Sequence, residues 1–386
     1  MKENIITLPD GRQVCQKFKQ CGGCAYETDI AEQLARKQAA AEGLLGRFCK
    51  VSPILSGESE RYRCKVTRVY KKASNGRLIC GVYKSSGNTL VPVKDCLLED
   101  KRLCEIARGL CGVFESFRLT PFDPVSGRGT LRHVLLRKGH KTGEIMLCIV
   151  TNSPVIKSPR SFANAIAGKF PDITTVVHNI CTDSLPISLG SREEILLGKG
   201  YIEDELLGLR FRIGARSFMQ VNPAQAERLY GLARGLLSEG TGTLLDAYCG
   251  TGTIGLICAE KAERLIGIES VSTAVSNARQ NAAHNGIKNA EFICADAGKV
   301  MEQIAQEGGE IGALIMDPPR AGADRRFLDS VSKLAPEQII YISCNMKTLA
   351  RDLSILKKTG YKAQSITPVD MFPRTRHCEC IVSLIR

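Results

Sequence analysis

The stretch GTLLDAYCGTGTIGL, residues 242–256, decides the fold predicted for the C-terminal part of the chain. Its apolar start is typical of a buried strand, and Gly250, Gly252 and Gly255 match the spacing G-x-G-x-x-G. Glycines at this spacing let the backbone turn tightly from a strand into a helix and approach a ligand closely. The stretch therefore predicts a strand, a ligand-binding loop and a helix in succession.

The same alternation of strand and helix continues to the C-terminus. Four more apolar segments are expected strands that end in polar residues: RLIGIES (264–270), AEFICAD (290–296), GALIMDPP (312–319) and QIIYISCN (338–345). Amphipathic segments typical of helices lie between them, such as TAVSNARQNAAHN (273–285) and ADRRFLDSVSKLA (323–335). This order predicts an α/β domain with a parallel sheet covered by helices, and a ligand site at the carboxyl ends of the strands.

Five chemically capable residues fall at that predicted edge: Asp246, Glu269, Asp296, Asp317 and Cys344. Glu269, about 20 residues after the glycines, can bind ribose hydroxyls, which both NAD and S-adenosylmethionine require. Asp246 precedes the loop, where a carboxylate favours a ligand with an ammonium group over a pyrophosphate. Asp296 could accept a hydrogen bond from an adenine amine. Each acid alone could equally be a solvated strand end or a helix cap, whereas all of them at one edge indicate a site.

Two further features concern reaction chemistry. The prolines of MDPPR (316–320) form a rigid turn that holds Asp317 at the edge. Cys344 follows the next strand, and we expect a partly exposed position near a helix N-terminus to lower the pKa of its thiol.

In the tail MFPRTRHCECIV (371–382), strand alternation puts His377 and Glu379 on one face. The two cysteines of HCEC then face a core, which makes a metal site there the weaker interpretation.

Composition limits the class of protein. The 386 residues have 44% hydrophobic content and a net charge of +13, of which +11 falls in residues 1–214 and +2 in residues 215–386. This excess favours a polyanionic partner for the first part of the chain. Neither a signal peptide nor 18 consecutive apolar residues is present, so a cytoplasmic protein without membrane contact is expected. Seventeen cysteines then indicate free thiols, metal ligands or a nucleophile rather than disulfides.

The first part of the chain has a different pattern. Residues 28–48 predict one amphipathic helix, and residues 56–212 predict a hairpin-rich, antiparallel α+β domain with turns such as RKGHKTGE (137–144). Arg61, Arg63 and Lys65 alternate, which predicts one phosphate-binding strand face, although a merely solvated face would show the same pattern. We therefore expect a segment 1–27, a helical connector 28–55 that packs on the catalytic domain, a central domain 56–214 and a catalytic domain 215–386.

Three N-terminal cysteines have the spacing of metal ligands. Cys15, Cys21 and Cys24 follow the pattern C-x5-C-x2-C, and thiolates this close can share one metal centre if a fourth ligand is supplied. Spacing alone leaves zinc and an iron–sulfur cluster open. The sequence therefore predicts a metal-binding segment at residues 1–27 without identifying the metal.

Several motifs together resemble one enzyme family. FMQVNPAQAERLY (218–230), LLDAYCGTGTIGL (244–256), MDPPRAG (316–322), ISCNMKTLARDL (342–353) and FPRTRHCECIV (372–382) are similar to the S-adenosylmethionine-dependent RNA uracil-C5 methyltransferases. The resemblance covers residues 215–386 and the cysteine segment. It implies a Rossmann-like methyltransferase domain, an α+β RNA-binding domain and an iron–sulfur segment of the type found in 23S rRNA (uracil-5-)-methyltransferases.

The resemblance also implies roles for single residues. Cys344 would add to carbon 6 of uracil, and Glu379 would remove the proton from carbon 5 after methylation. The residues expected to bind S-adenosylmethionine are Gln220, Tyr248, Thr253, Glu269, Asp296 and Asp317, although relatives often have asparagine where this chain has Thr253. Cys96 would join Cys15, Cys21 and Cys24 as ligands of a 4Fe–4S cluster, with zinc as the rival metal.

The resemblance favours 23S rRNA as the substrate, because relatives with the cysteine motif mostly modify ribosomal RNA. The target uridine would have to be unpaired or flipped out of its stack to reach such a site. No obligate protein partner is implied. A transfer RNA uracil-C5 methyltransferase remains the alternative substrate class, and an NAD-linked iron–sulfur oxidoreductase or a non-catalytic RNA-binding protein the alternative function classes. The oxidoreductase would leave Cys344, Glu379 and MDPPR without a role.

Overall fold

The computed structural model describes residues 4–27, 29–85, 87, 89–123, 126–183, 185 and 187–386. The chain forms two compact units. Unit 1 contains residues 1–27, 58–205 and 212–223, and unit 2 contains residues 28–57, 206–211 and 224–386. No helix in the described part of the chain is long and apolar enough to span a membrane.

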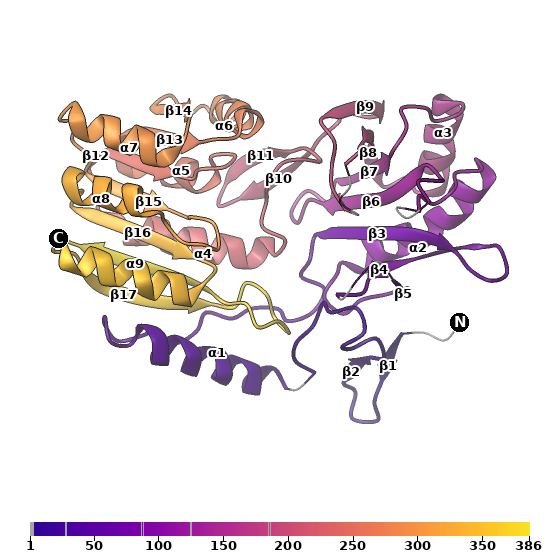
Figure 1. Cartoon of the computed structure of the whole chain (residues 1–386), viewed down its shortest axis with the longest axis horizontal. Coiled ribbons are helices and arrows are strands. Elements are labelled where there is room, and N and C mark those ends of the chain that lie inside the picture. The colour runs from indigo at the N-terminus through magenta and orange to yellow at the C-terminus, as the bar shows by residue number, and fades with distance from the viewer. Residues whose placement is uncertain are drawn as a thin grey trace. The chain divides into compact units, whose positions relative to one another are not determined.

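Unit 2 is built on a seven-stranded sheet in the order β14-β13-β12-β15-β16-β18-β17 (Figure 1). The first five strands in this order run parallel, and β18 pairs antiparallel with both β16 and β17. Their bounds are β12 Thr241–Ala247, β13 Ala262–Glu269, β14 Ala290–Cys294, β15 Ala313–Met316, β16 Gln338–Ser343, β17 Lys362–Val369 and β18 Glu379–Ile385. The predicted parallel α/β sheet is confirmed, with an antiparallel hairpin added at one edge.

Helices cover this sheet because its strands are apolar on both faces. Leu245 and Ala247 face a core shared with α1, α7, α8 and α9, while the alternate residue Leu244 is also fully buried. Aspartates accept backbone hydrogen bonds at the start of several of these helices, which stabilises each by about 1 kcal/mol. The helices are α1 Ile30–Leu45, α4 Pro223–Leu236, α5 Thr253–Cys258, the 3₁₀ turn η1 Ala259–Lys261, α6 Ser272–His284, α7 Ala297–Gln306, α8 Arg325–Leu334 and α9 Met346–Lys358.

The connector after α1 extends the edge of this sheet. Val51 and Leu55 form parallel bridges with Ile366 and Val369 of β17. Helix α1 lies beside α9 and β17, and its Ala41 and Leu45 are fully buried in the core of unit 2. The helix predicted at 28–48 is therefore present at Ile30–Leu45, and Thr28 lies outside the described residues.

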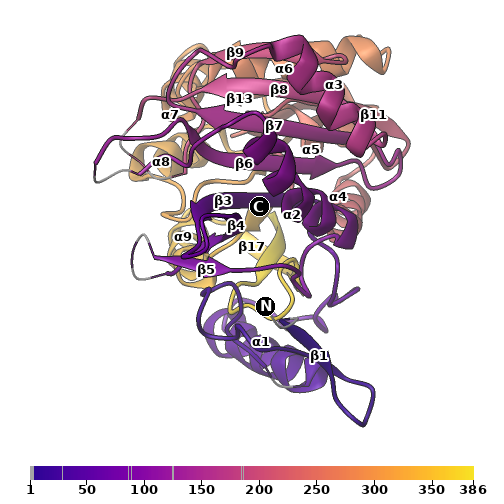
Figure 2. The same cartoon turned by 90° about the vertical axis from the view of Figure 1, so that its right-hand side faces the viewer.

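Unit 1 contains a second seven-stranded sheet, in the order β5-β4-β3-β6-β7-β8-β9. Its strands are β3 Lys65–Lys72, β4 Leu78–Tyr83, β5 Leu90–Pro92, β6 Leu131–Lys138, β7 Ile145–Thr151, β8 Ile173–Ile180 and β9 Arg192–Leu197. Helices α2 (Lys101–Ser116) and α3 (Pro159–Lys169) cover one face of this sheet, as Figure 2 shows, and their buried side chains share a core with it. The predicted hairpin-rich antiparallel sheet is present except at one strand pair, because β7 and β8 are parallel. Helix α3 is the crossover that such a pair requires.

Two small hairpins complete the chain. β1 (Ile5–Thr7) pairs with β2 (Gln13–Cys15) in the N-terminal segment, and β10 (Ile202–Leu206) pairs with β11 (Leu209–Ile213) where the chain passes between the two units. The compact units group residues 1–27 with the central domain and residues 28–57 with the C-terminal one. Residues 215–223, which the predicted range assigned to the catalytic domain, belong to unit 1. The functional division into four segments stays a prediction.

Candidate active site at the carboxyl edge of the sheet

Asp246 occupies the penultimate position of β12 and is almost fully buried. Its Oδ2 accepts a hydrogen bond from the backbone N–H of Gly255 at 2.8 Å. A Cβ at Gly255 would lie only 2.6 Å from that oxygen, so the third glycine of the loop is required for this close approach. Burial, with smaller contributions from Asp317 and Glu269, raises the pKa of Asp246 to about 7. The site thus holds a carboxylate that a bound cationic group would stabilise in its charged form.

Glu269 ends β13 and faces the glycine loop. Its carboxylate accepts hydrogen bonds from the backbone N–H groups of Gly250 at 3.2 Å and Val271 at 2.8 Å. The side chain is half-buried, so it is fixed in place while remaining accessible from the loop. This geometry suits the predicted binding of two ribose hydroxyls, a role that stays a prediction.

Three other predicted cofactor residues surround the same loop. Asp296 is exposed after β14 and caps α7 by accepting a hydrogen bond from the N–H of Lys299 at 3.0 Å. Tyr248 has a positive φ of 66° and its ring lies 5.3 Å from that of Phe327. Thr253 begins α5 and is buried. Asp296 is therefore a helix cap, as one of its two interpretations predicted. The other side of its carboxylate can still contact a ligand.

Gln220 is not part of this edge within unit 2. It belongs to unit 1, where it is buried and its backbone oxygen lies 3.8 Å from the Sγ of Cys64. Its predicted contact with the cofactor, which came only from the family resemblance, stays a prediction.

The MDPPR turn follows β15 and is tied down from α9. The side chain of Asn345 and the hydroxyl of Thr348 donate to the backbone oxygen of Arg320 at 3.0 and 3.4 Å. Asp317 is half-buried, and removal from water raises its pKa to about 7. Arg320 is exposed and acts electrostatically on both Cys344 and Glu379. Sequence reasoning assigned no role to Arg320, although the motif MDPPR marks its position directly after the rigid prolines.

The register of β16 and β18 brings the predicted nucleophile and base together. Ser343 pairs with Cys380, so Cys344 and Glu379, one step further along each strand, leave the sheet opposite each other. Facing residues of antiparallel strands have Cα atoms roughly 4.5–5.5 Å apart. Cys378 and Cys380 are buried on the opposite side, as predicted. The two residues that the resemblance assigns to catalysis therefore meet at one point of the edge.

The expected low pKa of the Cys344 thiol is wrong for this structure. Partial burial raises the pKa, Glu379 and Asp317 raise it further by their negative charge, and only Arg320 opposes them. Asn345 caps α9 directly after the thiol, but the favourable helix terminus is outweighed by burial and by the neighbouring carboxylates. Asp317 was expected at this edge and Glu379 near it, but the sequence pattern did not show the burial that, with their charges, outweighs the helix terminus.

Glu379 is poised to exchange a proton near neutral pH. Its side chain is 4% exposed, and burial, followed by Asp317 and Cys378, raises its pKa to about 8. A general base works best when its pKa lies near the working pH. The carboxyl group therefore has the protonation behaviour that proton removal from a carbon acid requires.

Replacing Asp246 with asparagine is expected to stabilise the ligand-free protein at pH 8. A carboxyl whose pKa rises on folding, here from 3.8 to about 7, weakens the fold as pH rises through that window, because the unfolded chain ionises first. A pKa shift of one unit corresponds to about 1.4 kcal/mol, so the free energy of unfolding can change by roughly 4 kcal/mol at most. We expect Asp246→Asn to raise the free energy of unfolding by about 1–3 kcal/mol at pH 8 and not to raise it below pH 4. Denaturation at both pH values measures it.

The matched control is Asp329→Asn, which removes a half-exposed carboxylate of α8 that pairs with Arg325. It should change stability by less than about 0.5 kcal/mol. Thermal stabilisation by S-adenosylmethionine should be lost in Asp246→Asn and kept in the control. A variant less stable than the wild type at pH 8 would show that the buried carboxylate is a net stabilising group.

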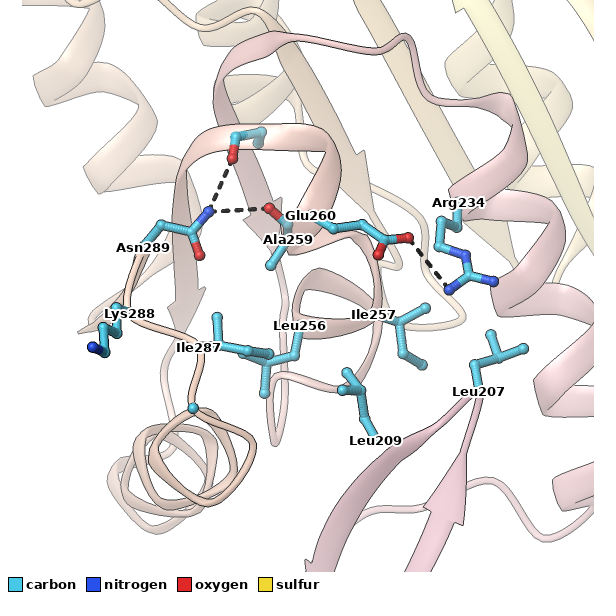
Figure 3. A pocket seen from close by; sticks show the side chains of 12 residues that line it. Leu207, Leu209, Arg234, Leu256, Ile257, Ala259, Glu260, Ile287, Lys288 and Asn289 are labelled. Atoms are coloured by element: carbon cyan, nitrogen blue, oxygen red, sulfur yellow. Dashed lines mark hydrogen bonds and ion pairs between the residues drawn. The ribbon is translucent and has the colours of Figure 1, made fainter.

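A cavity of about 470 Å³ in unit 2 lies away from this edge (Figure 3). It is lined by Leu207, Leu209, Leu256 and Ile287, with an ion pair between Arg234 and Glu260 at its rim. Ala262, which begins β13, also lines it, so the cavity is at the amino ends of the strands, opposite the carboxyl edge. It therefore takes no part in the candidate active site.

The four cysteines predicted as metal ligands all lie in unit 1 and are half-buried. Cys21 acts electrostatically on Cys15, and Cys24 acts on Cys96, while burial raises the pKa of the Cys96 thiol to about 12. Within the described ranges, no three Cys, His, Asp or Glu side chains form a group that could hold a metal. As placed, the four thiols form two neighbouring pairs.

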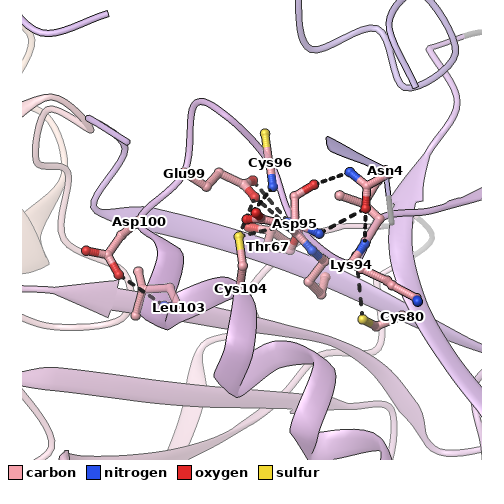
Figure 4. A network of polar contacts seen from close by, with 12 residues as sticks. Asn4, Thr67, Cys80, Lys94, Asp95, Cys96, Glu99, Asp100, Leu103 and Cys104 are labelled. Atoms are coloured by element: carbon pink, nitrogen blue, oxygen red, sulfur yellow. Dashed lines mark hydrogen bonds and ion pairs between the residues drawn. The ribbon is translucent and has the colours of Figure 1, made fainter. Parts of the chain in front are cut away.

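A polar network instead fastens the N-terminal segment beside Cys96 (Figure 4). The side chain of Asn4 accepts hydrogen bonds from the N–H groups of Lys94 and Asp95 at 3.0 and 3.1 Å and donates to the Asp95 oxygen. Asp95 in turn accepts from the N–H of Cys96 at 2.8 Å. No pattern in the sequence indicates this role of Asn4.

Comparison with known proteins agrees with this geometry. Residues 175–386 match the family model for tRNA (uracil-5-)-methyltransferases. An uncharacterized RNA methyltransferase from Bacillus cereus is 34% identical over 96% of this chain and 82% of its own length. One from Clostridium acetobutylicum is 35% identical over 97% and 83%.

The fold also has a counterpart among solved structures. The Pyrococcus abyssi tRNA (uracil-54, C5)-methyltransferase, in complex with S-adenosyl-L-homocysteine, superimposes with a TM-score of 0.79 over 100% of this chain and 92% of its own, at 24% identity. At this identity the likeness shows the fold alone. From the family match and the relatives, the chain belongs to the RNA (uracil-5-)-methyltransferase family and is an S-adenosylmethionine-dependent enzyme.

Proposed function

We propose that the enzyme methylates carbon 5 of a specific uridine in 23S ribosomal RNA, with Cys344 as nucleophile and Glu379 as base. The observation that carries this mechanism is the register of β16 and β18, which places the two residues opposite each other beside Asp317. S-adenosylmethionine, when bound, supplies the electrophilic methyl group. The glycine loop with Asp246, Glu269 and Asp317 offers the polar groups for it, and Tyr248, Thr253, Asp296 and Gln220 complete the proposed binding set.

The proposed reaction has three steps for the protein. The Cys344 thiolate adds to carbon 6 of the uracil, which places negative charge on carbon 5 and makes it nucleophilic. Carbon 5 accepts the methyl group and then carries both a methyl group and a proton. Glu379 takes this proton, the freed electron pair forms the C5–C6 double bond, and the C6–S bond breaks to return the thiolate. The proton on Glu379 then passes to solvent.

The charges at the edge support this order of events. Glu379 has a pKa of about 8, so at pH 7 most of the carboxyl groups are neutral and their repulsion of a Cys344 thiolate is small. Arg320 favours the charged form of both groups. A cationic methyl donor would do the same for Asp317 and Glu379. The positive charge of the donor sulfur is lost with the methyl group, so at the last step Arg320 is the cation that favours ionised Glu379.

The choice of 23S rRNA rests on the N-terminal cysteine motif. A transfer RNA substrate is the alternative, because the solved structure with the same fold over the whole chain acts on uridine 54 of tRNA. Trapping with RNA that contains 5-fluorouridine separates the two, since fluorine cannot leave as a proton and the covalent adduct persists. An adduct with 23S rRNA and none with tRNA would support the proposal. An adduct with tRNA and none with 23S rRNA would identify tRNA as the substrate. No adduct with either RNA would overturn the mechanism.

A cationic surface of unit 1 is the proposed contact for RNA phosphates. Of the predicted strand face, Arg61 lies before β3 and binds Asp95 with both guanidinium nitrogens, at 2.5 and 2.9 Å, so it is removed from the patch. Lys65 remains in the patch, beside Arg63 and Arg137. Burial, followed by the positive charges of these two residues, lowers the pKa of Lys65 to about 8. No ion pair of Arg63 or Lys65 occurs among the described side chains. A phosphate would relieve this crowding of like charges.

Lys65→Gln is expected to weaken RNA binding roughly three- to tenfold and to reduce the salt dependence of the affinity by about one ion. Lys288→Gln, a cation of unit 2 beside the cavity of Figure 3, is the matched control and should change neither. Filter binding at several salt concentrations measures both quantities. Equal salt slopes for wild type and Lys65→Gln would remove this surface from the RNA site.

We also propose that Cys15, Cys21, Cys24 and Cys96 bind a four-iron cluster, although the described geometry does not bring three of them together. The spacing and the family resemblance support it, and no step of the reaction uses it. Iron and sulfide analysis of anaerobically purified protein, with Cys21→Ser as comparison, tests the proposal. Zinc in place of iron would identify the rival metal, and protein free of both would contradict a metal site.

A further inference from the structure

The turn that contains His377 and leads into Glu379 is held by a buried ion pair with helix α1, which is distant in sequence. The turn, residues 370–378, joins β17 to β18, and Glu379 is paired with Val369 at its base. Asp370 therefore lies directly beyond the pair that contains the proposed base. Its side chain is 2% exposed and binds the ammonium group of Lys37, also 2% exposed, at 2.5 Å.

Helix α1 makes two further bonds to this turn. The ammonium group of Lys37 donates to the backbone oxygen of Phe372 at 3.1 Å, and the side-chain oxygen of Gln33 accepts from the N–H of Arg374 at 2.7 Å. Arg374 has a positive φ of 64°, a conformation that a non-glycine residue adopts only where its surroundings impose it. Gln33 and Lys37 are both buried, one helical turn apart on the face of α1.

The first residue of the turn is also fixed from the other side. The N–H of Asp370 donates to the oxygen of Leu55 at 2.9 Å. The side-chain amide of Gln225 bridges the oxygens of Leu55 and Asp370 at 3.1 and 3.2 Å. Every residue in this arrangement belongs to unit 2. The turn is thus bound at Asp370, Phe372 and Arg374 by side chains that take no part in cofactor binding.

A buried ion pair needs a reason beyond stability. Replacing such a pair with apolar side chains is often neutral or stabilising, so specification of a conformation explains a buried pair at this place better than stability does. Here the conformation specified is that of the residues immediately before Glu379. Lys37 also acts electrostatically on His377 and Cys378, which shows that its charge is felt up to the neighbour of Glu379.

We propose that Lys37 and Asp370 are positioning residues for the last chemical step: they hold the turn 370–378 so that the Glu379 carboxylate reaches the proton on carbon 5. The inference rests on the proposed function, because it assumes that Glu379 is the base. It concerns proton removal and release of Cys344, and not the attack on carbon 6 or methyl transfer, because the contacts of Lys37 and Gln33 are with the turn that leads into Glu379.

Lys37→Met tests the proposal by comparing two steps in the full-length enzyme. Adduct formation with 5-fluorouridine RNA reports attack and methyl transfer, and release of methylated RNA from ordinary substrate reports proton removal. We expect adduct formation within about threefold of wild type, release slowed by at least about tenfold, and a covalent adduct with ordinary RNA visible on a denaturing gel. Arg36→Met, which removes a half-exposed cation from the adjacent position of α1, should behave as wild type.

A purely structural role would slow both steps alike, as would partial unfolding, and either result would overturn the proposal. If Lys37→Met is not folded, the same comparison is made with Asp370→Asn, which removes the charge but keeps an oxygen facing Lys37. Normal release in the folded Asp370→Asn variant would also overturn it. Absence of any adduct in the wild type would instead refute the proposed function, so the two failures are distinguishable.

Discussion

Cys344→Ala should abolish methyl transfer, with a loss of at least about 10⁴-fold, and should remove the covalent adduct with 5-fluorouridine RNA. The thiol is half-buried after β16 and its Sγ is the only nucleophile that the proposed mechanism uses. Alanine deletes the sulfur without placing a new polar group in the site. Single-turnover methylation and a denaturing gel of the trapped complex measure the two effects.

The control for this change is Cys49→Ala. Cys49 follows α1, is half-buried like Cys344, and burial raises the pKa of its thiol as well. We expect full activity and adduct formation in this variant, and unfolding free energies within about 1 kcal/mol of wild type in both. Methylation by Cys344→Ala within tenfold of wild type would mean that no covalent bond to carbon 6 is needed, and the mechanism would have to be abandoned.

The sequence predicted the catalytic sheet well because its signals are local. Each parallel strand is a short apolar run followed at once by a polar residue, as in the run before Asp317, and this pattern needs no knowledge of distant contacts. The edge on which ligands bind follows from the topology of any parallel sheet. The sequence alone therefore predicts one shared edge for four site residues: Asp246, Glu269, Asp317 and Cys344.

Contacts between distant residues were not visible in the sequence. Lys37 and Asp370 are separated by 333 residues, and nothing in the pattern of α1 shows that a lysine and a glutamine on it are buried. Arg61 was assigned to a phosphate-binding face by alternation alone, whereas Asp95, remote in sequence, binds it. The pKa of the Cys344 thiol depends on the fold in another way, because the sequence places Asp317 at the same edge but does not show the burial that, together with Glu379 and Asp317, raises this pKa. Electrostatic environments depend on the fold, and alternation describes only the strand itself.

Glu379→Gln should stall the enzyme after methyl transfer, so that a methylated RNA remains bound to Cys344. Glutamine has nearly the shape of glutamate and keeps an acceptor oxygen at the start of β18, but its amide cannot take the proton from carbon 5. We expect turnover to fall about 10²–10⁴-fold, the range attributed to a general base. With ordinary RNA and labelled methyl donor, the label should appear in a protein–RNA band on a denaturing gel. Glu310→Gln, at an exposed site of the same unit, is the control.

The pH dependence separates the role of Glu379 as base from a role in binding. In the wild type, burial raises the pKa of Glu379 to about 8, so the fraction able to accept a proton falls as pH decreases below 8. Release of methylated RNA in single-turnover experiments should therefore slow about tenfold from pH 8 to pH 6.5. Glu379→Gln should lose this dependence while its adduct still forms. If the variant forms no adduct at any pH, Glu379 acts before methyl transfer, and proton removal belongs to another group at the edge.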